Sequence, residues 1–563
     1  MNTLIFLFYS FILCLSIFGF GKFYRKYALN NTIKSNLTID GIYGLLLIFV
    51  LSGISHIFFP HNYIHNSILH IIGIFLFVIN FKFTEFENEF KLFIIIYLVL
   101  LSSLFIGKTN EDFPYYHLPF SIQLSEQSLQ FGLGHLNHGF KQFSSIFLLN
   151  STFHLPFIEF YLFNFIGFFI QVIFYLFLFN ELFYNKNSSL SKAFIILTII
   201  FFLAKFKRLS EFGTDIPGQM IILISFFYLI KFIFMKERDY SSFYISLILT
   251  VFAITTKSIY IIYSIIPLII ITKSNQIYLF LKNLFFSKDI LLLFLSFLIL
   301  FIFNFSSTGC FLYPVSFTCF PDLASWGLKN ETIEYMNLHY ETWSKSLSGA
   351  GYSIENKEFL LENFQWINIW IKNYFFNKVS DYLLLILFIF LTFYFSFKKN
   401  FIELKENFIS YKDFTFVYAG LLIIFFIWFL NFPTLRYAGY LIVYLIFVFP
   451  FLIIIFRKKK FNFKNDNLSF KILLSLVLII FNYKNIERIV YEVKMPLESE
   501  NNLRNFPFFF VKKPPYEKIL IDKFEVNHIL NNDMCWSTPS TCIKNKNFKI
   551  EKKFNFKFYI PDE

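Results

Sequence analysis

Two acidic residues, Glu111 and Asp112, stand where a long apolar run gives way to polar sequence, in the segment GKTNEDFPYYHLPF. The run over 92–107 carries no charge, so the pair follows the end of an expected apolar helix. Pro114 and Pro119 restrict the backbone around the aromatic turn that comes next. A carboxylate held at the root of a structured loop suits a general base. The alternative is an acidic pair that simply ends a helix in water.

The residues after the acidic pair favour an ordered loop. Tyr116 and His117 crowd one short turn, and they are our candidates for contact with a substrate. Further along, Phe140, Phe143 and Phe147 recur at helical spacing, which predicts an amphipathic helix on a membrane surface. Such a loop would keep the carboxylate at the boundary where a water-soluble group meets a substrate in lipid.

A second polar group lies in the segment AKFKRLSEFGTDIPGQ, which also separates two apolar runs. Lys205, Lys207 and Arg208 could bind phosphate oxygens, because Arg and Lys form strong charge-assisted hydrogen bonds with phosphate. The alternative is a solvated turn between two helices. Asp215 could assist in binding a metal or a sugar, or it could cap the next helix.

Other polar residues interrupt apolar sequence. Lys257 divides two apolar runs and Arg436 lies at the end of another, where each could meet the same phosphate or simply reach the membrane surface. Glu159, Asn164 and Gln171 roughly share one face of a helix, and we expect them to line a polar groove rather than to face lipid.

The composition indicates a membrane protein. The 563 residues are 56% hydrophobic, with a mean hydropathy of +0.58, and only 15% are charged. A soluble chain would carry roughly 25% charged residues. The net charge of +13 does not indicate nucleic acid, since the basic residues cluster between apolar runs, as membrane topology predicts.

Apolar runs long enough to cross a bilayer as helices predict an all-α polytopic fold with about fourteen spans. We place the spans near 3–20, 41–59, 65–82, 90–107, 155–181, 189–204, 216–235, 241–256, 258–272, 289–305, 381–397, 414–430, 437–456 and 468–483.

Lys and Arg recur in alternate loops, as in RKKK at 457–460, and the positive-inside rule assigns these loops to the cytoplasm. The loops 108–154 and 306–380 then lie outside and carry interfacial helices. The chain divides into a membrane domain over 1–483 and a small C-terminal domain over 484–563, also outside.

The cysteines agree with this orientation. Cys14 falls within a span, whereas Cys310, Cys319, Cys535 and Cys542 all fall in regions assigned outside. The short spacing within GCFLYPVSFTCF and CWSTPSTC predicts one disulfide in each segment, because these regions would face an oxidising compartment. A zinc site is the rival explanation, but neither pair has the C-x2-C spacing.

Aromatic and histidine pairs in the outside loops have two interpretations each. Trp366 and Trp370 share one helix face and could stack on sugar rings, although an interfacial aromatic belt is the simpler reading. His135 and His138 could ligate a metal, but no third ligand is evident, so a hydrogen-bonded loop is favoured.

The chain resembles the GT-C superfamily of polytopic glycosyltransferases, in an uncharacterised bacterial branch. It is distantly similar to the transferases that use dolichyl- or polyprenyl-phosphate sugars to donate mannose or aminoarabinose. The resemblance rests on DFPYYHLP, FGLGHLNHGF, TDIPGQ, AITTKSIY, GCFLYPVSFTCF, FPTLRYAGY and CWSTP. It implies that Asp112 is the catalytic base, with Glu111 as the second candidate. About four spans precede the loop here, where many members of the superfamily have one.

The resemblance implies transfer of a sugar from a polyprenyl-phosphate-type lipid to a glycan or lipid acceptor. The site would face the periplasm or exterior of a bacterial cytoplasmic membrane. The alternatives are an O-antigen-type polymerase or ligase, and a transporter or flippase of lipid-linked saccharides. No cofactor follows from the sequence, although a divalent cation stays open, and the oligomeric state is not indicated.

Overall fold

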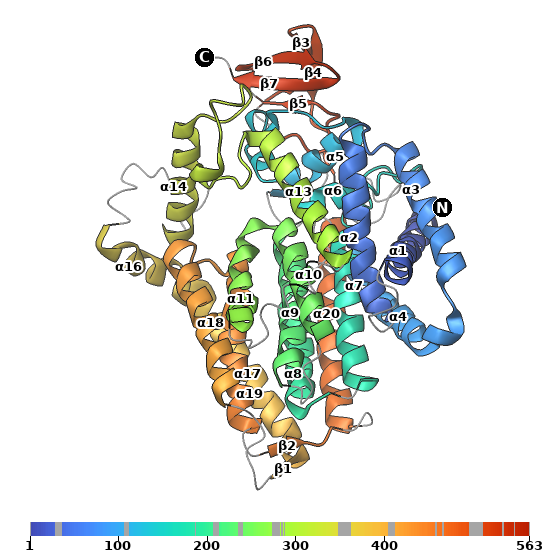
Figure 1. The fold of residues 1–563 in the computed structure, drawn as a ribbon, viewed down its shortest axis with the longest axis vertical. Helices are drawn as coiled ribbons and strands as arrows, with labels where there is room; N and C mark the ends of the chain where they lie inside the picture. The colour runs from blue at the N-terminus through green and yellow to red at the C-terminus, as the bar shows by residue number, and fades with distance from the viewer. Residues whose placement is uncertain are drawn as a thin grey trace.

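The computed structural model describes the chain except residues 1, 29–35, 106–111, 186, 207–212, 235–239, 273–281, 283–284, 286–287, 347–361, 404–410, 457–458, 464–466, 495–510, 532–533, 545 and 562–563. A body of long helices carries a set of short strands at one end, which is the top in Figure 1. A small two-stranded sheet, β1 (Phe401–Glu403) with β2 (Lys459–Phe461), marks the opposite end.

Ten helices in the described part of the chain are long and apolar enough to cross a membrane. A helix satisfies every backbone hydrogen bond within one segment, which lipid requires. The ten are α1 (Asn2–Tyr27), α2 (Leu37–His56), α3 (Tyr63–Asn80), α7 (Phe165–Phe183), α9 (Asp215–Phe234), α13 (Lys288–Thr308), α17 (Ser380–Phe397), α18 (Tyr411–Asn431), α19 (Tyr440–Phe456) and α20 (Leu468–Lys494). The protein is therefore built as a multi-pass membrane protein.

The remaining four expected spans fall on helices that are shorter or more charged. They are α4 (Phe83–Leu104), α8 (Ser189–Lys205), α10 (Tyr240–Thr256), and the 3-10 helix η4 (Ser258–Ser264), which continues as α11 (Ile265–Thr272). The total of fourteen spans thus stays a prediction, and ten is the number that length and composition support.

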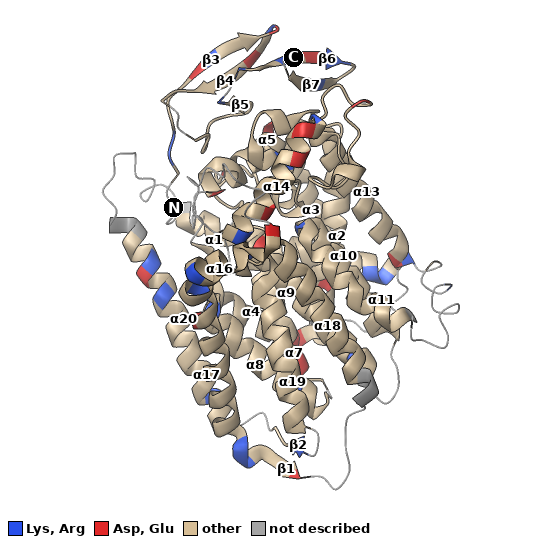
Figure 2. Ribbon diagram, turned by 90° about the vertical axis from the view of Figure 1, so that its left-hand side faces the viewer, with Lys and Arg blue, Asp and Glu red and all other residues tan. Residues whose placement is uncertain are grey.

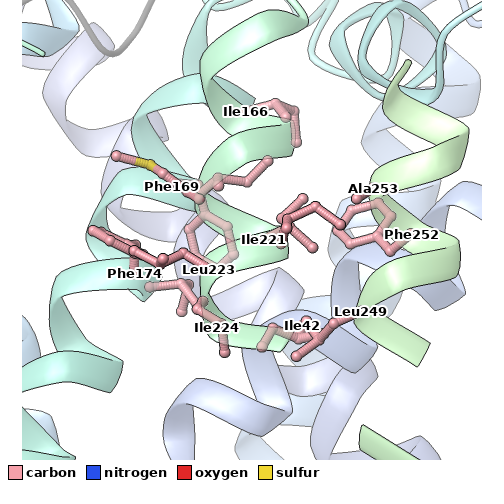
Figure 3. Close-up of a cluster of buried hydrophobic side chains, with 14 of the residues drawn as sticks. Ile42, Ile166, Phe169, Phe174, Ile221, Leu223, Ile224, Leu249, Phe252 and Ala253 are labelled. Atoms are coloured by element: carbon pink, nitrogen blue, oxygen red, sulfur yellow. The ribbon is translucent and has the colours of Figure 1, made fainter. Parts of the chain in front are cut away.

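The centre of the body lies where α2, α7, α9 and α10 meet (Figure 3). Ile42, Ile166, Ile221 and Leu249 project there from these four helices, and all are buried. The whole apolar window of α7 is buried, whereas most of that of α3 is not. Since lipid is as apolar as these side chains, close van der Waals packing holds the helices together.

Charge is sparse along the helices and gathers near their ends (Figure 2). A pair that the sequence reading missed is Arg25 with Asp40, which joins α1 to α2 through a 2.6 Å contact between Arg25 Nε and Asp40 Oδ1. Both side chains are 1% exposed. Removing one partner would leave a buried charge uncompensated, so the pair fixes how the two helices lie together.

The prediction of an amphipathic helix on the membrane surface, in the first large loop, is wrong. The loop instead folds into the short helices α5 (Leu118–Glu126), η2 (Leu133–His135), η3 (His138–Lys141) and α6 (Ser145–Ser151). Phe140, Phe143 and Phe147 are all buried. Phe120 stacks on Phe140 at 4.7 Å, and Phe143 stacks on Phe303 of α13 at 4.6 Å, so the aromatic rings face protein rather than lipid.

The fifth span begins ten residues later than the predicted start at 155, since α7 runs from Phe165. Glu159 lies in the turn before it and is exposed. Asn164 is buried and donates to the Leu104 carbonyl at 2.8 Å, and Gln171 accepts from Ser103 at 2.9 Å. The two amides therefore bind α4 instead of lining a groove with Glu159.

The C-terminal domain, whose fold class the sequence did not indicate, is made of strands. Strands β3 (Tyr516–Ile521) and β4 (Phe524–Ile529) form a hairpin, and β5 (Cys542–Ile543) pairs with β4 in parallel. Strands β6 (Phe548–Lys553) and β7 (Phe556–Pro561) form a second hairpin. The expected boundary at 484 falls inside α20, because its last charged turns remain helical to Lys494.

The C-terminal domain docks on the first large loop. The Phe131 N–H donates to the Lys557 carbonyl and the Tyr559 N–H donates to the Phe131 carbonyl, each at 2.9 Å. The ring of Phe131 also stacks on Phe558 at 4.6 Å. These contacts join segments more than 400 residues apart, so the loop and the domain form one structure at this end of the molecule.

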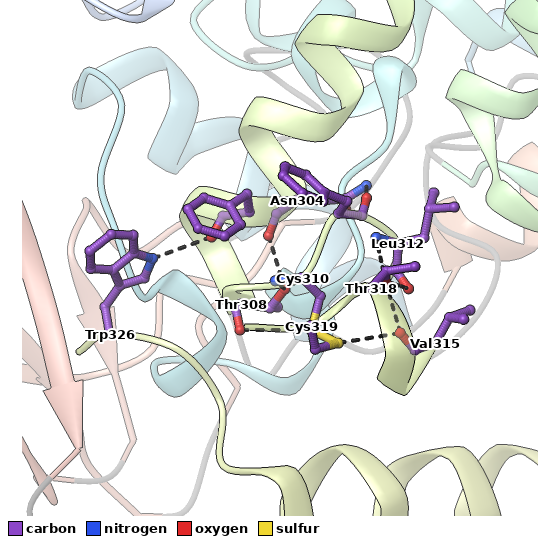
Figure 4. The surroundings of a disulfide bond; sticks show 10 residues. Asn304, Thr308, Cys310, Leu312, Val315, Thr318, Cys319 and Trp326 are labelled. Atoms are coloured by element: carbon purple, nitrogen blue, oxygen red, sulfur yellow. Dashed lines mark hydrogen bonds between the residues drawn. A yellow bond between two sulfur atoms is a disulfide. The ribbon is translucent and has the colours of Figure 1, made fainter. Parts of the chain in front are cut away.

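Two disulfides lie at the same end, in the pairs that the sequence predicts. Cys310 is joined to Cys319, and Cys535 to Cys542. Figure 4 shows the first, which follows α13. The Cys310 N–H donates to Thr308 Oγ1 at 3.2 Å, and Thr318 Oγ1 donates to the Val315 carbonyl at 2.8 Å.

Candidate active site

Four charged side chains from distant parts of the sequence meet at one place. Arg436 forms an ion pair with Asp112 through Nη2 and with Asp215 through Nε, the latter at 2.7 Å. Lys257 Nζ forms an ion pair with the other oxygen of Asp215. We call these four residues the charged cluster. All four were candidates from the sequence, and Asp112 and Arg436 are 324 residues apart.

The two carboxylates are placed by the starts of helices. Asp112 directly precedes a π-helical turn, η1 (Phe113–His117), in which Pro114 occupies an early position. Asp215 is the first residue of α9, where the helix dipole favours a negative charge. Asp215 is thus the first residue inside the helix rather than the cap before it, and each of its oxygens binds a cation.

The two cations are placed by breaks between helices. Lys257 is extended, with φ −159° and ψ 125°, between α10 and η4. Arg436 lies in a second π-helical turn, η9 (Leu435–Gly439), just before α19. Within that turn Ala438 has φ +63°, in the left-handed region that non-glycine residues seldom adopt. Interrupted helices of this kind put charged side chains at a depth where continuous helices would present apolar ones.

Two tyrosines that the sequence reading did not select complete the cationic side. The ammonium of Lys257 lies 4.6 Å from the centre of the Tyr437 ring, a favourable cation–π distance. Tyr260 donates a hydrogen bond to the backbone carbonyl of Asp215. Gly218 makes this possible, since a Cβ there would lie 2.2 Å from the Tyr260 ring. The available signal was closeness in sequence, since Tyr260 follows Lys257 by three residues, in the helix η4 that begins after it.

Tyr116 and His117 support Asp112 from the other side. Their rings are 4.4 Å apart, and both contact Phe147 of α6. Burial raises the pKa of Tyr116 well above its usual range, and the charge of Asp112 adds to this. Burial lowers the pKa of His117 to about 4, so its ring is neutral at pH 7. His117 is only 4% exposed, and its ring packs between Tyr116 and Phe147.

The turn that carries Arg436 is held by three hydrogen bonds. Trp370 Nε1 donates to the Pro433 carbonyl at 2.8 Å, and Trp428 Nε1 donates to the Thr434 carbonyl at 3.1 Å. The Leu435 N–H donates to the Tyr374 hydroxyl at 2.9 Å. Trp366 and Trp370 are both buried against α18, so they form neither a sugar-stacking surface nor an interfacial belt.

The charged cluster is partly open to solvent. The side chains of Arg436 and Asp112 are 39% and 27% exposed, and those of Asp215 and Lys257 are 18% exposed. Two negative and two positive charges balance, which makes their burial tolerable. An anionic ligand could exchange for a carboxylate on Arg436 or Lys257, because a phosphate offers the same bidentate oxygens. A carboxylate released in this way is a proton acceptor.

The other candidate residues are not all in this cluster. Lys205 lies beside the start of α19, with its ammonium 4.7 Å from the Tyr440 ring and 5.5 Å from the Tyr382 ring. Glu111, Lys207 and Arg208 lie outside the described residues.

The histidines of the first loop form hydrogen bonds, as the favoured interpretation expects. His135 Nε2 lies 3.0 Å from the Trp326 carbonyl, and His138 Nε2 lies 3.0 Å from the Tyr340 hydroxyl. Over the described ranges there is no group of three or more His, Cys, Asp or Glu residues that could hold a metal ion. At the charged cluster, Arg436 and Lys257 occupy carboxylate oxygens that a divalent cation would need.

Comparison with known proteins gives one result. A family model described as a domain of unknown function, DUF8201, matches residues 3–443. This range holds the whole charged cluster and leaves out the C-terminal strands. No curated protein and no solved structure matches the chain.

Proposed function

The chain belongs to the DUF8201 family, and for it we propose the activity of a membrane glycosyltransferase that uses a polyprenyl-phosphate-linked sugar. The observation that carries the proposal is the ion pair between Asp112 and Arg436 within the charged cluster. It puts a carboxylate that could accept a proton beside two cations that could bind the phosphate of a lipid donor.

The proposed reaction is a direct displacement. The hydroxyl of the acceptor gives its proton to the Asp112 carboxylate as its oxygen attacks the anomeric carbon of the donor sugar. The bond from that carbon to the phosphate oxygen breaks, and the polyprenyl phosphate leaves with the bonding electrons. Arg436 and Lys257 stabilise the negative charge that develops on the leaving phosphate. Asp215 keeps both cations in place through its two oxygens.

The position of the cluster in the molecule supports these roles for Asp112 and the two cations. The cluster lies on the side of the body that meets the C-terminal domain, since the Trp536 N–H donates to the carbonyl of Pro114, two residues after Asp112. A lipid-borne phosphate and a water-soluble acceptor could meet there. We propose that this end is the outer face of a bacterial cytoplasmic membrane, and that the helices form a GT-C-like body of fourteen spans. The activity would serve the assembly or modification of a cell-surface glycan.

A transfer assay tests the proposal. Purified protein in detergent would be mixed with a polyprenyl-phosphate sugar radiolabelled in the sugar, together with an acceptor extract from the same cells. We expect the label to move from the organic phase into the acceptor fraction. Release of free sugar without an acceptor product would indicate hydrolysis. Movement of intact lipid-linked sugar across a vesicle membrane, with no transfer, would favour a flippase and contradict the proposal.

A further inference from the structure

A cleft of about 640 Å³ lies between the C-terminal domain and the helical body. One side is lined by Lys513, Tyr516 and Thr538 of the C-terminal domain, and the other by the end of α5 and the segment 154–160. Its volume falls within the ~300–1,000 Å³ that is usual for small-molecule sites. No residue of the charged cluster lines it, so the cleft is a separate feature.

The lining combines aromatic rings with hydrogen-bonding groups. Three aromatic rings of the lining, those of Tyr63, Phe157 and Tyr516, are 52%, 78% and 38% exposed. Aromatic side chains of this size are more often buried. Glu126 and Glu159 add carboxylates beside them. A sugar ring has an apolar face that packs on aromatic rings and an edge of hydroxyls that donate to carboxylates. The lining therefore matches a saccharide.

The charge of the lining argues against a phosphate or another polyanion. The carboxylates of Glu126 and Glu159 are opposed by a single ammonium, that of Lys513. A site for an anion would present an excess of Arg and Lys, as in the proposed phosphate contacts of the charged cluster. A neutral, hydroxyl-rich ligand fits the balance better.

The segment 154–160 holds its side chains through an unusual backbone. Phe157 and Glu159 have φ of +68° and +53°, in the left-handed region that bulky residues rarely adopt. Two hydrogen bonds to the Leu155 carbonyl, from the N–H of Ile158 at 3.3 Å and of Glu159 at 3.0 Å, stabilise this tight turn. Strained conformations of this kind persist where the surrounding structure fixes them, often at ligand sites.

A disulfide-closed loop connects the cleft to the charged cluster. The Trp536 N–H donates to the Pro114 carbonyl at 3.1 Å, and its ring lies 6.0 Å from Phe113, next to Asp112. Four residues later the Ser540 N–H donates to Glu126 Oε2 at 2.7 Å, at the cleft. The loop thus runs beside α5, whose nine residues span ~14 Å, from one site to the other.

We propose that the cleft binds the saccharide chain of the acceptor, several sugar residues behind the hydroxyl that reaches Asp112. The assignment of that saccharide as an acceptor rests on the proposed function, but binding itself does not. The ligand is a neutral oligosaccharide, whether free or carried by a lipid.

Photo-crosslinking in the full-length protein tests binding without requiring turnover. Benzoyl-phenylalanine would replace Phe157 or, as a control, Leu520, which is 74% exposed on β3 of the C-terminal domain. One probe is a set of fluorescent oligosaccharides released by mild acid from the surface polysaccharide of the source cells. The second is the polyprenyl-linked oligosaccharide extract of those cells, and polyprenyl phosphate without sugar is the competitor.

We expect labelling at position 157 and none at 520. Labelling by both probes would identify the saccharide itself as the ligand, and labelling by the second alone would show that the lipid carrier is needed. E159Q should reduce labelling about tenfold, as expected for loss of one hydrogen bond to a charged group, whereas E551Q on exposed β6 should not. Equal labelling at both positions, or full competition by polyprenyl phosphate alone, would overturn the proposal.

The two proposals fail in different ways. If saccharide labels position 157 but no sugar transfer is found, the cleft is a saccharide site and the proposed reaction is wrong. If transfer occurs and E159Q leaves both the labelling and the acceptor KM unchanged, the cleft assignment falls while the reaction stands.

Discussion

At the scale of single residues, the charged cluster is a chain of shared partners. Arg436 divides its guanidinium between Asp112 and Asp215, and Asp215 divides its oxygens between Arg436 and Lys257. Changing one member therefore alters either the charge or the hydrogen bonds that its neighbours meet. Each substitution therefore needs a comparison that separates loss of chemistry from loss of structure.

Replacing Asp112 with Asn tests the base directly. The substitution keeps the shape of the side chain and removes the proton acceptor. We expect transfer to fall ~10²–10⁴-fold, the usual effect of losing a general base, with little change in folded yield. Asp381 is an exposed acid in the first turn of α17, and D381N should keep wild-type activity in the same radiolabel assay. Full activity of D112N would remove Asp112 from the mechanism.

Replacing Arg436 with Lys tests whether the two-pronged geometry of the guanidinium, which binds two carboxylates at once, is needed. An ammonium cannot reach Asp112 and Asp215 through two fixed nitrogens at once, although the charge is kept. We expect a loss of ~10–100-fold in kcat/KM for the lipid donor. R436Q should lose more, because it also removes the charge opposite the phosphate. If R436K were fully active, the fork geometry would be irrelevant to donor binding.

His117 should make the folded protein sensitive to acid. Its pKa is lowered by burial from its usual 6.5 to about 4, so the unfolded state binds the proton more readily in that interval. Stability is complete above about pH 6.5 and falls as the pH drops towards 4, by up to ~1.4 kcal/mol per pH unit for this one group. Thermal unfolding in detergent across that range should show a weaker pH dependence for H117Q than for wild type. Parallel pH dependences would contradict the assignment.

The sequence identifies the members of the charged cluster but not their pairing. Asp112, Asp215, Lys257 and Arg436 stand out because each is a charged residue at the edge of an apolar run. Nothing local states that residues 112 and 436 are neighbours, since only the packing of the helices brings them together. Tyr437 was missed for the same reason, because its partner Lys257 is distant in sequence.

At the scale of elements, short irregular turns position most of the charged cluster. η1, η9 and the break at Lys257 each place one charged residue, and each depends on close packing by a neighbour. Gly139 shows how tight this packing is, since a Cβ there would lie 2.1 Å from the Tyr116 ring.

We expect G139A to displace Tyr116 and thereby η1, and so to reduce transfer at least tenfold. A methyl group has no room, and overpacking of this kind costs ~1–3 kcal/mol. G420A is the matched control, because the nearest atom to a Cβ there is a side-chain carbon of Ile269 at 3.2 Å. Activity and thermal stability of both variants should be measured together. Equal effects of the two substitutions would show that Tyr116 has no special part in placing Asp112.

Helices were predictable from the sequence where apolar runs were long, because bilayer thickness sets their length. The C-terminal strands were not, since β3 and β4 are only six residues each and mix apolar with polar residues. The aromatic residues of the first loop led to the wrong prediction of a helix on the membrane surface. Their helical spacing is the same whether the apolar face is turned to lipid or to protein.

At the scale of the whole molecule, the two ends differ in kind. One end carries the charged cluster, both disulfides and the C-terminal strands, and the other carries β1 and β2. Lys398, Lys399, Lys459 and Lys460 lie at the second end. By the positive-inside rule, these basic residues predict that this end faces the cytoplasm.

Reporter fusions test this orientation. Alkaline phosphatase fused after Asn185 or after Lys399 should be inactive, because both positions belong to the basic end. The same reporter fused after Pro561 should be active, since β7 lies with the disulfides. A cytoplasmic reporter such as green fluorescent protein should give the reverse pattern. Phosphatase activity of the fusion after Lys399, and none of the fusion after Pro561, would show the opposite orientation. The charged cluster would then face the cytoplasm.

The contact between Trp536 and Pro114 bears on how the protein is made. The turn that begins at Asp112 is synthesised early, yet it is braced by a loop that is translated more than 400 residues later. In the proposed orientation this loop reaches its place only after the last helix has inserted and the tail has left the cytoplasm. A nascent or truncated chain would lack that brace, so the turn that carries Asp112 would stay unfinished until the whole chain has been inserted in the membrane.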